Sequence, residues 1–198
     1  MTNSLIRFKL TKENITVNND SIEITNTANW IKNVVVGCNF CPFAAKALAK
    51  KTVRYVVKEN TDFKSALTAL AEEFEFLNSN LNFETTFIIF SDGFTDFLQY
   101  LDLVDKGERL LLKENYEGIY QLASFHPQYL FAGSNENDPA NYTNRSPYAM
   151  LHILREDSIT KALENFDDPN SIPEKNIDFA KTKGIAYMKM LSASCIVD

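Results

Sequence analysis

The sequence has few of the side chains on which most catalytic and metal sites depend. It contains 198 residues but only three cysteines and two histidines, His126 and His152. Because these side chains are the usual nucleophiles, bases and soft metal ligands near neutral pH, a reactive site has to draw on this small set. Three cysteines are also an odd number, which indicates reduced thiols rather than a disulfide framework in a chain without an export signal.

A basic surface and long apolar runs are missing as well. The formal net charge is -6 and the sequence pI is about 5.0, whereas binding to nucleic acid or to an anionic membrane requires a basic face. No apolar stretch is long enough to span a bilayer, and no amino-terminal stretch joins a basic segment to an apolar run. We therefore expect a cytoplasmic protein that binds neither nucleic acid nor membranes.

Several catalytic sequence patterns are absent. The chain has no phosphate-cradling glycine loop, no H-E-x-x-H and no G-x-S-x-G, which disfavours the mechanisms that depend on them. With 45% hydrophobic residues and no internal repeat or linker, the chain is typical of one globular domain. We predict a single domain over residues 20–198, preceded by an extension over residues 1–19 whose alternating residues 5–17 form an edge strand or hairpin.

Apolar periodicity predicts alternating helices and strands. Helices are expected over residues 20–36, 43–50, 62–78 and 94–115, and strands over residues 52–58, 84–91 and 118–125. The strand–helix–strand–helix–strand order implies parallel pairing with right-handed crossovers. We expect an α/β or α+β domain of two layers, in which helices flank a small, mainly parallel sheet of about three strands in an order that the sequence leaves open.

Residues 124–156 stand out as a long segment rich in Asn, Ser, Tyr and Pro that begins at the end of the third predicted strand. Such a segment inside a compact domain is usually functional or disordered, and its five aromatic residues argue against disorder. Ligands gather beyond the carboxyl ends of strands in sheets of this kind. We predict an ordered functional loop that leads into a helix over residues 147–156, followed by helices over residues 158–166 and 174–193.

Cys41 is the candidate nucleophile. It directly precedes Pro42 and a predicted short helix, so backbone N–H groups and the helix dipole are expected to lower the pKa of its thiol. Cys38 gives a C-x-x-C spacing in which it could act as a resolving thiol. The alternative is that both cysteines pack as small apolar side chains, and Cys195 is expected to be inert.

The histidine of the sequence Phe-His-Pro, His126, directly follows the third predicted strand. It is a candidate base or metal ligand, because its ordinary pKa suits proton transfer near neutrality. The alternative is a structural histidine that forms hydrogen bonds with loop carbonyls.

A group of polar residues precedes the helix predicted over residues 147–156 and suggests an anion site. Arg145, Asn141, Asn144 and Ser146 lie at its predicted amino terminus, where backbone N–H groups attract anions and an arginine can hold a phosphate or carboxylate with two hydrogen bonds. The alternative is a helix that these side chains only cap. On the same predicted helix, the spacing of His152, Arg155 and Glu156 places them on one face.

Four sequence blocks resemble those of the DUF1415 family, single-domain bacterial proteins of unknown function. They are WIKNVVVGCNFCPFA, ETTFIIF, GIYQLASFHPQYLFAG and NYTNRSPYAMLHILRE. The resemblance covers the chain from Ser21 to the final helix and supplies no activity. It implies that matched positions include Cys41, Pro42, His126, Pro127, Tyr129, Asn141, Asn144, Arg145, Ser146, Pro147, His152, Arg155 and Glu156, which adds Tyr129 to the candidate substrate-binding residues. The family usually has an apolar residue at the position of Cys38, which weighs against the C-x-x-C pair.

Three hypotheses follow from these residues. The first is a small-molecule enzyme in which Cys41 is the nucleophile, His126 or His152 is the general base, and Arg145 with Asn144 holds a phosphate or carboxylate group. The second is a metal site formed by His126, His152 and either Cys41 or Glu156, with a position open to water. The third is a non-enzymatic module that binds a nucleotide or carboxylate under the long loop. The sequence specifies neither a cofactor nor an oligomeric state.

Overall fold

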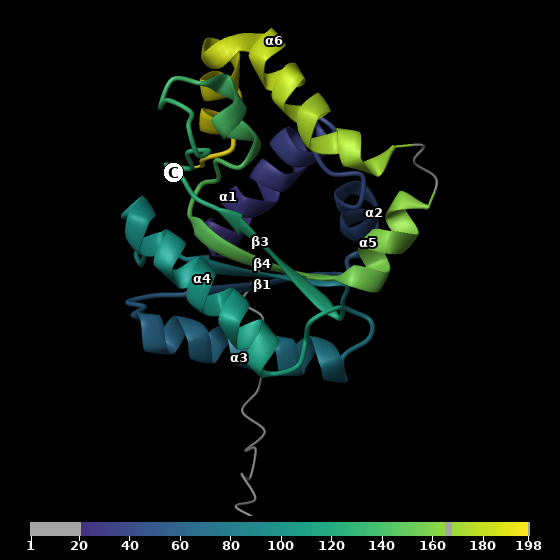
Figure 1. Ribbon diagram of the computed structural model, residues 1–198. Coiled ribbons are helices and arrows are strands. Elements are labelled where there is room, and N and C mark those ends of the chain that lie inside the picture. The colour runs from purple at the N-terminus through teal and green to yellow at the C-terminus, as the bar shows by residue number, and fades with distance from the viewer. Residues whose placement is uncertain (1–20, 165–167, 198) are drawn as a thin grey trace, which may run out of the picture.

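The computed structural model describes residues 21–164 and 168–197, and the strand or hairpin predicted over residues 5–17 lies outside them. The described chain forms an α+β domain with a mixed sheet of four strands (Figure 1). The strands are β1 (Val53–Lys58), β2 (Thr85–Phe90), β3 (Tyr120–Phe125) and β4 (Ala149–Arg155), in the spatial order β1-β2-β4-β3. Only β1 and β2 are parallel, since β4 pairs antiparallel with both β2 and β3. The prediction of about three mainly parallel strands therefore needs correction.

The extra strand, β4, replaces a predicted helix. Residues 149–155 were expected to lie within a helix over residues 147–156, but they form a strand between β2 and β3, and the prediction is wrong. The first six residues of β4 are buried, because a central strand is covered by helices on both faces. Such a strand is a continuous apolar run, which periodicity alone cannot distinguish from a buried helix.

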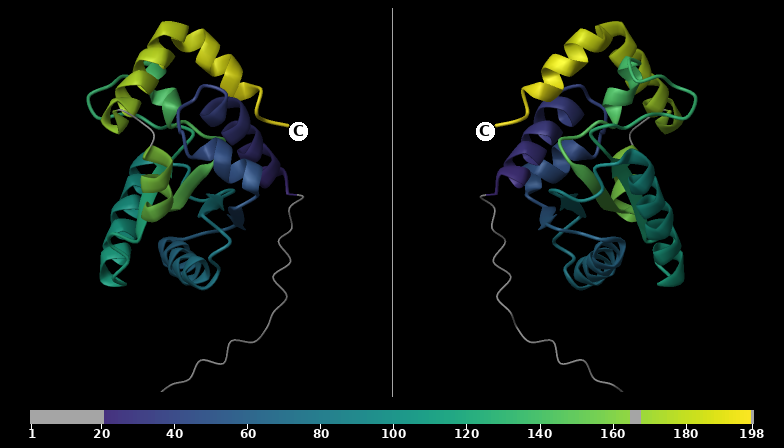
Figure 2. Two further views of the ribbon diagram at one scale, coloured as in Figure 1. Left: turned by 90° about the vertical axis from the view of Figure 1, so that its right-hand side faces the viewer. Right: turned by 90° about the vertical axis from the view of Figure 1, so that its left-hand side faces the viewer.

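The helices form a layer on each face of the sheet (Figures 1 and 2). Helices α3 and α4 cover one face, and α1, α2 and α6 lie on the other. The helical bounds are α1 Ile22–Trp30, α2 Ala44–Lys50, α3 Phe63–Ser79, α4 Phe97–Lys113, α5 Glu156–Leu163 and α6 Ile172–Ala193. A π-helix, η1 (Ile31–Val36), continues α1, and two 3-10 helices, η2 (Pro139–Thr143) and η3 (Pro169–Ser171), lie in the connections.

Local signals explain why α3 and α4 start where they do. The carboxylate of Asp62 accepts a hydrogen bond from the backbone N–H of Ser65, and Asp96 does the same for Gln99, so both helices have side-chain caps. Gly107 then allows α4 to lie close to the sheet, because a Cβ at this position would be 3.1 Å from Leu70 and 3.3 Å from Leu122.

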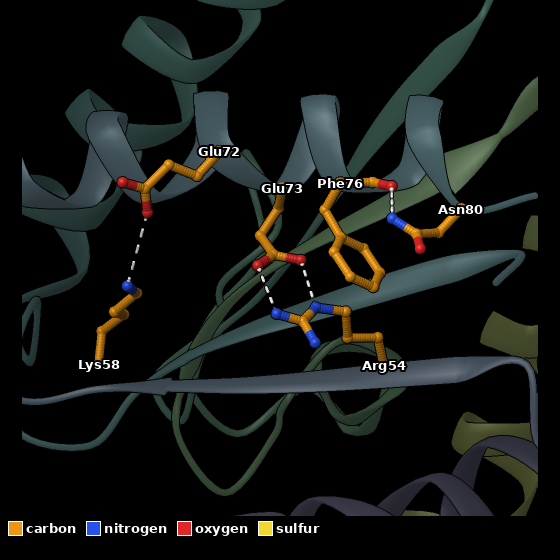
Figure 3. A network of polar contacts seen from close by, with 6 residues as sticks. All are labelled: Arg54, Lys58, Glu72, Glu73, Phe76 and Asn80. Atoms are coloured by element: carbon orange, nitrogen blue, oxygen red, sulfur yellow. Dashed lines mark hydrogen bonds and ion pairs between the residues drawn. The ribbon is translucent and has the colours of Figure 1, made fainter. Parts of the chain in front are cut away.

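A buried ion pair joins β1 to α3 on this face (Figure 3). Arg54 of β1 donates two hydrogen bonds to the carboxylate of Glu73, at 2.8 and 3.1 Å. The ring of Phe76 lies 3.9 Å from the guanidinium carbon and covers it. Residues of the edge strand are only partly buried, so this pair and its aromatic cover fix α3 to β1 where the apolar core ends.

The segment between β3 and β4, residues 126–148, is an ordered loop rather than the longer one predicted over residues 124–156. Its 3-10 helix η2 packs against α6, and Tyr142 of η2 belongs to the same buried cluster as Met188 of α6. This packing places the loop beside the carboxyl-terminal helix.

Candidate functional site

A cavity of about 130 Å³ lies between the sheet and the amino-terminal helices. All four strands and α1, η1 and α2 contribute to its wall, which is predominantly apolar. Among its lining residues, Cys41 and His152 are the two that can act as a nucleophile or a base. Two of the predicted catalytic residues thus line the same space, which we name the Cys41–His152 cavity, although no hydrogen bond between the Cys41 thiol and His152 is found within the described residues.

The π-helix η1 forms part of the cavity wall through Ile31 and Val35. The wider turn continues into the following residues, since the N–H of Gly37 donates to the carbonyl of Lys32 at 3.0 Å, five positions back. A Cβ at Gly37 would lie 2.2 Å from the carbonyl oxygen of Asn33, so this turn requires glycine. Turns of this kind are rare and frequently occur at functional sites, whereas the apolar spacing of residues 20–36 predicts only an ordinary helix.

His152 is held in the cavity wall by stacking and by one hydrogen bond. Its ring lies parallel to that of Phe87, with 3.7 Å between centroids. The Thr85 hydroxyl donates its only hydrogen to the carbonyl of Ile153 at 2.6 Å, so Nε2–H of His152 must donate to Thr85 Oγ1, which lies 2.5 Å away. The proton is therefore on Nε2 and Nδ1 carries the lone pair, and the hydrogen bond that His152 forms within the described residues is the one through Nε2.

Burial lowers the pKa of His152 to about 3. The side chain is almost completely buried, and desolvation disfavours the charged imidazolium. No acidic side chain offsets this shift. At neutral pH, His152 is consequently a neutral imidazole with a free acceptor nitrogen.

The environment of Cys41 combines two opposing effects on its thiol. Hydrogen bonds from the backbone N–H groups of Phe43 and Ala44 lower its pKa, as expected for a cysteine before a helix. Burial has the larger effect and raises the pKa above its ordinary value. The lowered pKa predicted from the sequence is therefore wrong, and the thiol is neutral at neutral pH.

Because only the thiolate reacts, we expect iodoacetamide to modify Cys41 more slowly than free cysteine at pH 7.5, by about tenfold or more. The alkylation rate should rise with pH, and the pH at which it reaches half of its maximum should be higher than for an ordinary thiol. Mass spectrometry of Cys41-containing peptides measures the rate, and Cys41→Ser is the control for assignment. Modification at pH 6 that is faster than that of free cysteine would contradict the raised pKa.

The other histidine, His126, lies outside the cavity and is fully buried. Its Nδ1 accepts a hydrogen bond from the N–H of Gln128 at 3.0 Å, so its Nε2–H donates to the carbonyl of Phe94 at 2.9 Å. Both ring nitrogens are occupied, and burial lowers the pKa of the ring. The contacts agree with the alternative of a structural histidine, which here ties the start of the loop to the segment before α4.

Arg145 also lies outside the cavity. Its Nε donates to the carbonyl of Tyr129 and its Nη2 to the carbonyl of Glu136, both at 3.1 Å. The guanidinium lies over the ring of Tyr142, 4.7 Å from its centroid. The helix amino terminus predicted beside Arg145 does not exist, because the residues that follow form β4.

The polar residues around Arg145 bind one another within the loop. The Asn141 side chain accepts from the N–H of Phe131 and donates to the carbonyl of Asn135. Asn144 accepts from the hydroxyl of Thr143, and the Ser146 hydroxyl donates to the carbonyl of Tyr148. These bonds maintain the shape of the loop. Tyr129 packs against Phe97 and Phe131.

Arg155 and His152 point to opposite faces of the sheet. Alternation along β4 separates them, and Arg155 donates to the carbonyls of Phe83 and Leu77 and to the hydroxyl of Tyr120. Arg155 thereby binds a carbonyl at the end of α3. Glu156 begins α5. The predicted common helical face of His152, Arg155 and Glu156 is therefore wrong.

The structure does not assemble the predicted metal site. Within residues 21–164 and 168–197, no group of three or more His, Cys, Asp or Glu side chains is placed to hold a metal ion. The C-x-x-C pair is not supported either. Cys38 lies in one buried cluster with Cys195, whereas Cys41 packs with a different cluster. Burial, and to a smaller extent the nearby Cys195, raises the pKa of the Cys38 thiol.

These features define an α+β protein whose mixed sheet and amino-terminal helices line an apolar cavity with one thiol and one neutral imidazole. The chain belongs to the family described as "Protein of unknown function (DUF1415)", whose family model matches residues 23–190, which confirms the resemblance of the sequence blocks. No curated protein and no solved structure matches the chain. In the part of the chain that the structure describes, no helix combines the length and apolarity needed to cross a membrane.

Proposed function

We propose that the protein binds a small, largely apolar molecule in the Cys41–His152 cavity and that Nδ1 of His152 accepts a hydrogen bond from its polar end. The observation that carries this proposal is the neutral imidazole with a free acceptor nitrogen in an otherwise apolar wall. Ligand pockets are typically apolar, with a few polar groups that fix the orientation of the ligand. A cavity of about 150 Å³ can bind benzene, so a ring-sized molecule with a hydroxyl or amine group suits this one.

The shape and lining of the cavity support a role in binding. Buried side chains such as Trp30, Phe43 and Ala47 line it, and a ligand would supply them with packing contacts. An apolar residue at position 152 could also stack on Phe87, so the imidazole adds a polar group that packing does not require. A ligand that fills the cavity and donates a hydrogen bond to Nδ1 would use both features.

A second candidate function is an enzyme that uses Cys41 as its nucleophile, favoured by the N–H groups of Phe43 and Ala44 near the sulfur. In such a reaction the sulfur would add to the carbonyl carbon of a bound ester, and the thiol proton would pass through Nδ1 of His152 to the leaving alcohol. An acyl thioester on Cys41 would remain. We rank this function second, because burial keeps both groups neutral, and fast alkylation of Cys41 would reverse the ranking.

Phenol and toluene, which have nearly the same shape, test the proposed hydrogen bond. Both should bind to the full chain in NMR titrations, and His152→Phe should weaken phenol about tenfold relative to toluene, because the buried hydroxyl then lacks an acceptor. The substitution keeps an aromatic ring against Phe87, so the packing of the wall is conserved.

Ala123→Leu is the control for location. Ala123 lines the cavity, and the larger side chain should abolish binding of both compounds by filling the space, with the fold intact by circular dichroism. An unchanged ratio of phenol to toluene affinity in His152→Phe would contradict the hydrogen bond. Undiminished binding of both compounds in Ala123→Leu would contradict the site itself.

A further inference from the structure

A second candidate site lies on the outer side of the loop, separate from the Cys41–His152 cavity. Two hollows, of about 550 Å³ and 300 Å³, are lined in common by Pro127, Arg145 and Lys189. We call these joined hollows the Arg145–Lys189 groove. None of its lining residues lines the cavity, so the two sites can be tested independently.

The guanidinium of Arg145 is fixed in position but not neutralised. It is bonded to two backbone carbonyls and stacked on Tyr142, which uses two of its five N–H groups. In the described part of the chain, no carboxylate lies within ion-pair distance of it. A rigid arginine with unused donors needs little reorganisation to bind an anion with two parallel hydrogen bonds.

Lys189 adds a second positive charge from another element. It is exposed on α6 and lines both hollows. The larger hollow also contains Glu136, so two cations face one carboxylate in a chain with a net charge of -6. Leu98 and Leu130 line the same hollow, and 72% of Leu98 is exposed. The larger hollow therefore combines two positive side chains with two leucines in one lining.

We propose that the Arg145–Lys189 groove binds a small organic phosphate or carboxylate, with the anion at the two cations and an apolar body against Leu98 and Leu130. The sequence predicts an anionic ligand at Arg145 through a helix amino terminus that the structure lacks. The structure replaces that arrangement with a fixed guanidinium and a lysine that is 44 positions further along the chain. Neither Asn144 nor Asn141 lines this groove.

Titration of the full chain with phenyl phosphate, followed by NMR at 50 mM salt, tests the proposal. Lys189→Gln should weaken binding by up to about fivefold, the upper end for an exposed charge pair, and Lys189→Glu should weaken it further. Lys181→Gln is the matched control, since Lys181 is exposed on α6 before its kink at Gly184 and does not line the groove. These lysine variants should fold normally, whereas Arg145 also supports the loop.

Two further ligands distinguish the parts of the proposal. Benzoate should shift the same NMR resonances as phenyl phosphate, since a carboxylate and a phosphate accept hydrogen bonds from the same donors. Inorganic phosphate should bind more weakly than phenyl phosphate, because it lacks the apolar body. Equal affinities of Lys189→Gln and Lys181→Gln for phenyl phosphate would overturn the proposal, as would no binding by the unmodified protein. The affinity of the Cys41–His152 cavity for phenol should be the same in all lysine variants. The proposal for the groove can therefore be disproved without affecting the proposal for the cavity, and the reverse.

Discussion

Replacing Glu73 by alanine is expected to lower the free energy of unfolding by about 3–5 kcal/mol. The carboxylate is the ion-pair partner of Arg54, and the two side chains are only 7% and 10% exposed. Without Glu73, the guanidinium remains charged under the ring of Phe76, with little access to water. Urea denaturation followed by circular dichroism measures the loss.

Two comparisons separate the buried charge from a general effect of mutation. The double replacement Arg54→Met with Glu73→Leu should cost much less than Glu73→Ala alone, because both charges are removed together. The pair of Lys58 with Glu72 is exposed and 3.9 Å long, so Glu72→Ala should change stability by less than about 1 kcal/mol. If Glu73→Ala is no more harmful than Glu72→Ala, the buried pair does not hold α3 on the sheet.

Local sequence patterns predicted those parts of the fold that depend on local interactions. The helix predicted over residues 62–78 has one apolar face and an aspartate cap, and α3 follows it within one residue at each end. The strand predicted over residues 84–91 and its neighbour over residues 52–58 likewise correspond to β2 and β1. The helix has its periodicity and its cap within the element, and the two strands are short runs rich in β-branched and aromatic residues bounded by polar ones, so the signal is local in each case.

The sheet order depended on information that no single segment carries. Residues 149–155 have no alternation because both faces are buried, and only pairing with β2 and β3 decides between helix and strand. This error changed the predicted site, since a helix would place His152 beside Arg155, whereas the strand directs the two side chains to opposite faces. A long-range contact thus determined which polar residues meet.

The candidate site shows the same division. Cys41 and His152 could be selected from the sequence because so few thiols and imidazoles are present. Their protonation states could not be predicted from the sequence, because they depend on burial by distant segments. At Cys41, the effect of burial on the thiol pKa is larger than that of the neighbouring N–H groups. Thr85, the hydrogen-bond partner of His152, lies 67 residues away in the chain, and only the antiparallel pairing of β2 with β4 brings it into contact.

Acidification is expected to destabilise the protein through His152. The folded-state pKa is about 3 and the ordinary value is 6.5, so between these values the unfolded chain binds more protons than the folded one. The free energy of unfolding should therefore fall by up to about 1.4 kcal/mol for each pH unit as pH decreases from 6.5 towards 3. Urea denaturation at intervals between pH 7 and pH 4.5 measures this slope.

His152→Phe isolates the contribution of this residue, because the difference between the two pH profiles cancels groups that titrate alike in both proteins. Burial also lowers the pKa of His126. In the variant, His126 should therefore leave a smaller decrease in the free energy of unfolding per pH unit. Asp62 has a pKa below 3.8 and adds little above pH 4.5. Parallel profiles would show that His152 is protonated in the folded protein. A difference of about 2–3 kcal/mol between pH 6.5 and 4.5 would mean that the imidazole stays neutral there, so that Nδ1 remains an acceptor and phenol affinity should be constant over the same range.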